Sequence, residues 1–102
     1  MIESTLTERQ HTHGDYVLTS ALSQSLKDVA FSLPRTQPLE PYQKEAIEMI
    51  LHKIARIING DSYFIDSWRD IAGYAHLTID LINKSPKALD TVQQYFKPIS
   101  DE

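Results

Sequence analysis

Acidic side chains recur at about one helical turn in the middle of the chain, where they could hold a metal ion together. Glu45 and Glu48 are three residues apart, and Asp66 and Asp70 are four apart. Residues at these spacings lie on the same face of a helix, so each pair would present two carboxylates to one side. Magnesium prefers carboxylate oxygens, and the sequence contains no cysteine that would favour a softer metal. We therefore expect these four acids to form a magnesium site if their two segments are antiparallel helices.

Both aspartates also have a structural interpretation. Asp66 would stabilise the start of a helix, near the positive end of the helix dipole. Asp70 falls on an apolar border of the helical wheel, where a carboxylate requires a metal ion, hydrogen-bond donors or a cation. The candidate cations are Lys53, Arg56 and Arg69, and with any of them Asp70 would form a structural ion pair.

A polar strip runs along the segment that carries the two glutamates. On a helical wheel it includes His52 and Arg56, with Lys53 at its flank. Lys53 and Arg56 could clamp phosphate groups, because a guanidinium offers a two-pronged donor and an ammonium offers a point charge. They could equally pair with the nearby acids, and the whole strip could be an ordinary solvated helix face.

The stretch before the first helix combines histidines with other polar residues. His11, His13 and Asp15 could bind a transition metal, although their spacing alone is a weak indication. A second interpretation is a helix start, in which Gly14 turns the chain and Asp15 caps the helix. The third is substrate contact, with His13, Asp15 and Tyr16 facing a base or sugar.

Three helices are expected to position these residues. Apolar side chains recur with helical spacing over residues 16–32, 41–59 and 66–83. Prolines within 33–41 prevent a helix from running through that connection. Gly60 is expected to end the second helix, because glycine makes a left-handed conformation available there. No alternation of period two appears, so the predicted fold class is all-α.

The length of 102 residues fits one domain, 1–102. We expect an N-terminal arm over 1–15, a helical core over 16–83, and a short helix with a tail over 84–102. No apolar stretch is long enough to span a bilayer and no signal peptide is visible, so a cytoplasmic location and no membrane contact are expected. The net charge is −4 without a basic stripe, which argues against DNA binding.

The second and third helices are apolar over more than the usual third of their circumference. Three helices in one chain cover few such faces, so we predict a homodimer or higher homo-oligomer that completes a helical bundle. The alternative is that a C-terminal helix over 86–95 folds over the exposed side. Trp68, which has helical spacing with other apolar residues, is expected in the core rather than beneath a base.

The combined pattern resembles the MazG-like all-α nucleoside triphosphate pyrophosphohydrolases. The resemblance rests on Glu45-x-x-Glu48 on one helix, a glycine-containing loop, and Asp70 on the next, and it covers roughly residues 8 to 82. Within it, the chain is similar to a small phage and prophage branch, through the stretches 13–16, 52–56, 60–61 and 66–74. It implies a bundle of two or more chains, magnesium on clustered acids, and cleavage of a nucleotide between its α and β phosphates.

One position departs from that family. Its enzymes carry Glu-x-x-Asp on the later helix, whereas Ser67 stands three residues before Asp70 and Asp66 is one residue out of step. The resemblance implies catalytic roles for Glu45, Glu48 and Asp70, with Asp66 as a further metal ligand. The candidate substrate-binding residues are His13, Asp15, Tyr16, His52, Lys53 and Arg56. The alternative, which Ser67 favours, is a non-catalytic phage protein that sequesters a nucleotide or binds a host protein.

Overall fold

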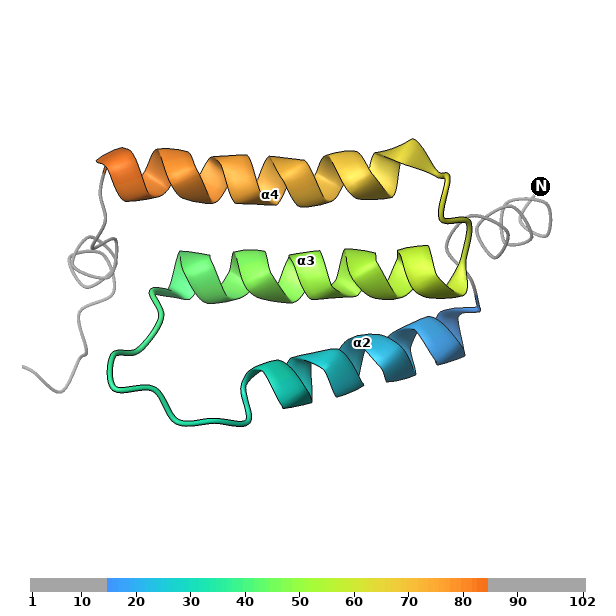
Figure 1. Cartoon of the computed structure of the whole chain (residues 1–102), viewed down its shortest axis with the longest axis horizontal. Coiled ribbons are helices and arrows are strands. Elements are labelled where there is room, and N and C mark those ends of the chain that lie inside the picture. Colours follow the sequence, from blue (N-terminus) through green and yellow to red (C-terminus); the bar gives the residue numbers. More distant parts are fainter. Residues whose placement is uncertain (1–14, 85–102) are drawn as a thin grey trace, which may run out of the picture.

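The structure is a computed structural model that describes residues 15–84. These residues form three helices, α2 (Tyr16–Ala30), α3 (Pro41–Asn59) and α4 (Ile65–Lys84), and no strand occurs among them. The helices lie side by side in roughly one layer, with α3 in the middle and each helix antiparallel to the next along the chain (Figure 1). The all-α prediction is confirmed, and the expected helix bounds are correct to within two residues. The predicted N-terminal arm to residue 14 and the predicted C-terminal helix lie outside the described residues.

Side-chain caps define the starts of α2 and α3. The Asp15 carboxylate accepts a hydrogen bond from the Val17 backbone N–H at 2.9 Å, which confirms the capping interpretation of Asp15. At α3, Glu40 and Gln43 form a reciprocal capping box, and Pro41 occupies the first turn, where its missing N–H costs nothing. These local bonds fix where each helix begins.

A short turn connects α3 to α4. Gly60 ends α3, as predicted, by donating its N–H to the Arg56 carbonyl at 2.8 Å. Its φ of −121° shows that the left-handed conformation available to glycine is not used. Asp61 then organises the turn. Its carboxylate accepts from the Tyr63 N–H at 2.9 Å, and its carbonyl accepts from the Phe64 N–H at 3.1 Å. This turn reverses the chain so that α4 returns along α3.

The residues buried between the helices are mostly small. Ala55 of α3 has no exposed surface, and Ser23 of α2 and Ser67 of α4 are almost as completely buried. The other buried residues are Thr19, Ala46 and Ile57. Small side chains let helices approach closely, but they remove little apolar area from water. The described layer therefore has a thin core.

Many of the large apolar side chains lie on the surface of the described layer. They are Tyr16, Val17, Leu18, Val29, Leu33, Ile58, Tyr63, Ile65, Trp68, Leu77, Ile79 and Ile82. Trp68 is 53% exposed and its indole N–H donates to the Ser62 carbonyl at 2.8 Å, so the prediction that it lies in the core is wrong for a single chain. Within residues 15–84, none of the helices is both long enough and apolar enough to cross a membrane.

Candidate functional site

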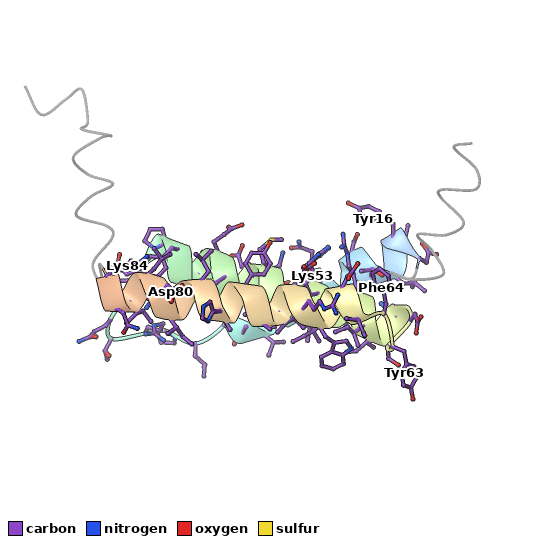
Figure 2. The ribbon with its side chains drawn as sticks, turned by 90° about the horizontal axis from the view of Figure 1, so that it is seen from above. Tyr16, Lys53, Tyr63, Phe64, Asp80 and Lys84 are labelled. Atoms are coloured by element: carbon purple, nitrogen blue, oxygen red, sulfur yellow. The ribbon has the colours of Figure 1, made fainter. Side chains whose placement is uncertain are left out.

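Two consecutive residues of α3 connect its polar strip to the helices on either side. His52 Nδ1 lies 3.3 Å from Ser23 Oγ of α2, and Lys53 Nζ lies 3.0 Å from Asp70 Oδ2 of α4. Successive side chains on a helix diverge by about 100°, which is why neighbours in sequence reach different helices. The strip is therefore the place where all three helices meet through polar side chains. Figure 2, seen from above, shows Lys53 in the half of the layer that contains the start of α2, between the middle of the layer and Tyr16.

The Lys53–Asp70 ion pair accounts for the carboxylate on the apolar border of α4. The lysine side chain is 12% exposed and the aspartate side chain 48% exposed. A distance of 3.0 Å allows a charge-assisted hydrogen bond. Of the three cations considered from the sequence, Lys53 is the one that pairs with Asp70. The charge of Asp70 is thus compensated within the fold.

The other acids of the predicted magnesium site lie apart. Asp66 lies in the first turn of α4 and is 3.8 Å from Arg69, with both side chains largely exposed. Glu45 is exposed, and Glu48 is partly buried one turn before His52. Over residues 15–84 no three potential ligands are close enough together to hold a metal ion. Magnesium binding at these acids stays a prediction.

Ser67 occupies a closed environment. It is only 2% exposed, on the face of α4 that packs against α3. The expected resemblance to the MazG-like enzymes implies a metal-binding acid at this position. A carboxylate at Ser67 would lose nearly all of its water, and such a loss is costly without a compensating cation. The position that lacks the expected acid is therefore one of tight helix packing.

Arg56 differs from Lys53, the other cation of the strip, in having no carboxylate partner among the described residues. It lies one turn beyond His52 and three residues beyond Lys53, and it is partly buried. Between residues 15 and 84 the basic side chains within 4 Å of a carboxylate are Lys53, Arg69 and His76, so the Arg56 guanidinium has no carboxylate partner there. The guanidinium of a partly buried arginine without a counter-charge is suited to an anion from outside the chain.

The predicted N-terminal contacts are described only in part. Asp15 caps α2, and Tyr16 begins that helix with a side chain that is 76% exposed. The start of α2 lies at the same end of the layer as the end of α3 (Figure 1). His11 and His13 lie outside the described residues. Tyr16 therefore offers an exposed aromatic ring at that end.

Sequence reasoning did not identify Ser23 as a partner of His52. The two residues are 29 positions apart, and a lone serine on a helix is an ordinary residue. The one clue in the sequence was that Ser23 and Thr19 are four residues apart and so share a face of their helix. The structure shows that both are buried.

Comparisons with protein-family models, with curated proteins and with solved structures found no match to this chain. The resemblance to the MazG-like enzymes accordingly stays a prediction that rests on the residues alone.

Proposed function

We propose that this protein binds a nucleotide through its phosphate groups on the polar strip of α3, without hydrolysing it. The observation that carries the proposal is Arg56, a partly buried residue whose guanidinium has no carboxylate partner between residues 15 and 84. Lys53 and His52 lie within about one turn of it. Phosphate oxygens would supply the counter-charge that Arg56 lacks, and a guanidinium binds them with two parallel hydrogen bonds.

The exposed ring of Tyr16 supports a nucleotide rather than a simple anion. Tyr16 lies at the end of the layer where α3 finishes, which is also the end toward which Arg56 is displaced within α3. Aromatic rings stack on bases because both have flat, polarisable faces. A nucleotide with its phosphates at Arg56 would have Tyr16 available for its base.

Binding is favoured over hydrolysis because Asp70 is already engaged. The resembling enzymes use this acid to hold magnesium, whereas Asp70 here lies 3.0 Å from Lys53. Hydrolysis by that route requires Asp70 to exchange its ammonium partner for a metal ion. The buried Ser67 also favours binding over hydrolysis, because it stands where the resemblance implies a further metal-binding acid.

The test compares two arginine variants by calorimetric titration with ribo- and deoxyribonucleoside triphosphates, with and without magnesium. We expect Arg56→Gln to weaken binding about tenfold or more, which is the usual effect of losing a charge-assisted pair. Arg69→Gln is the matched control, because Arg69 is exposed on α4 and already paired with Asp66. It should bind like the parent.

Pyrophosphate release is measured in the same samples. Binding without release supports the proposal, and equal affinities for the Arg56→Gln variant and the parent would contradict it. If the parent releases pyrophosphate in the presence of magnesium and the Asp70→Asn variant does not, the protein is a pyrophosphohydrolase and the proposal of binding without hydrolysis is wrong.

A further inference from the structure

One face of α4 carries an uninterrupted line of exposed apolar residues. Their spacings alternate between three and four, the pattern by which helices pair in coiled coils. The line, called the α4 stripe below, consists of Ile65, Trp68, Ala72, Ala75, Ile79 and Ile82, all of them exposed. It extends over nearly the whole of the 20-residue helix.

The α4 stripe lies on the opposite side of the layer from the polar strip. Relative to the buried Ser67, Trp68 is displaced by about 100° in one direction around the helix, whereas Asp70 is displaced by about 60° in the other. Asp70 contacts Lys53, which marks the polar side. Ile58 of α3, which is 62% exposed, lies away from the polar strip as well and extends the apolar side. A partner on the stripe would leave Arg56 open.

The order of residues in the stripe is self-complementary. In two antiparallel copies of α4, the residues that meet have numbers that add up to 147. Ile65 then meets Ile82 of the partner subunit, Trp68 meets the partner's Ile79, and Ala72 meets the partner's Ala75. Large side chains fill the two ends of such a seam, and alanines at the centre let the helices approach closely.

We propose that two copies of this chain associate through the α4 stripe, antiparallel, around a two-fold axis near Gly73. Closed two-fold pairing is the commonest arrangement of homo-oligomers, and it requires a surface that complements itself. The stripe meets that requirement in sequence order and in side-chain size.

The area of the face also fits a second copy. A helix of 20 residues is about 30 Å long and neighbouring helices are about 10 Å apart, so α4 with α3 offers about 600 Å² per copy. Two copies would bury about 1,200 Å², which is at the lower end of stable interfaces. One terminal helix of the same chain would cover a single groove of this face and would leave the rest in water.

Engineered cysteines test the register directly, because the chain has none of its own. Ala72→Cys and Ala75→Cys chains, one of them with an added affinity tag, are mixed and mildly oxidised. Antiparallel pairing places residue 72 opposite residue 75, so the mixed disulfide should dominate over both self-linked products. Parallel pairing would give the self-linked products instead and would overturn the proposed geometry. Leu77→Cys, exposed on α4 but off the stripe, should form little of any disulfide.

Light scattering tests the association itself. The parent should have twice the mass of one chain, and Ala75→Glu should reduce it to one chain mass at the same concentration. A carboxylate in the central layer of both copies should weaken association by about a hundredfold or more. Leu77→Glu adds the same charge off the stripe and should remain dimeric, with circular dichroism checking that each variant is helical. A parent that is monomeric at every concentration would overturn the proposal.

Discussion

The ion pair between Lys53 and Asp70 makes the effect of Asp70→Asn on stability predictable in sign. Lys53 Nζ lies 3.0 Å from Asp70 Oδ2, and the lysine is the more buried partner, with 12% of its side chain exposed. Asparagine is neutral, so the substitution leaves an ammonium that has lost most of its water and has no counter-charge. We expect the free energy of unfolding to fall.

The magnitude follows from the unequal exposure of the two partners. Exposed ion pairs contribute up to about 1 kcal/mol, whereas removing one partner of a fully buried pair costs about 3–5 kcal/mol. Asp70 is 48% exposed, so solvent screens the pair. The loss in free energy of unfolding should therefore be closer to the value for exposed pairs than to that for buried pairs, at about 1.5 kcal/mol. In a domain of this size that corresponds to a decrease in Tm of roughly 6–12 °C. Lys53→Met should cost less, about 0.5 kcal/mol, because it leaves behind the half-hydrated carboxylate rather than the buried ammonium.

The assay is a thermal and urea melt of the parent, both single variants and the double variant. All four are measured at one protein concentration, since self-association would raise the apparent stability of each. The double variant should be close in stability to Lys53→Met alone, because neither of its two introduced side chains carries a charge that needs a partner. An Asp70→Asn protein that melts at or above the parent would refute the reasoning, and so would equal losses in the two single variants.

Substitutions at three further positions test the local structure by thermal melts. Asp15→Ala should lower the free energy of unfolding by about 1 kcal/mol, because the Val17 N–H loses its acceptor; no change would mean that the cap is not formed. Gly73→Ala should raise it by about 0.5–1 kcal/mol, since an added Cβ meets no atom within 4 Å and alanine favours the helix; a loss would show a hidden contact. Ser67→Asp should lower it by about 3 kcal/mol through burial of a charge, whereas Ser67→Ala should cost about 1 kcal/mol or less; equal effects would contradict the buried placement.

The helices were predictable because their ends are specified locally. Pro41 and the acid before it define the start of α3, and Asp15 defines the start of α2, through bonds between residues two or three apart. The position of Trp68 was not predictable in the same way. Helical spacing identifies a residue as part of an apolar face, but it does not identify which face packs within the chain. Trp68 belongs to a face that the other described helices leave uncovered.

The site was predictable as a set of candidate residues but not as a set of partners. Asp70 had three candidate cations, and the choice of Lys53 depends on the register of α4 against α3. That register is set by the turn at Asp61 and by the close packing at Ala55 and Ser67, which have no distinctive sequence pattern. The backbone conformation of Gly60 could not be predicted from the sequence either, because glycine permits a left-handed conformation without requiring one.

The central position of α3 has a consequence for how the chain folds. Helix contacts are concentrated between α2 and α3 and between α3 and α4, so each helix packs on its neighbour in sequence. Domains with such local contacts fold fast, in about microseconds to milliseconds. The connection between α3 and α4 spans residues 60–64, whereas the one between α2 and α3 spans 31–40. Because loop closure costs more entropy in a longer loop, we expect the α3–α4 hairpin to form first and α2 to dock onto it. Amide hydrogens of α2 should then exchange with solvent at a lower opening free energy than those of α3.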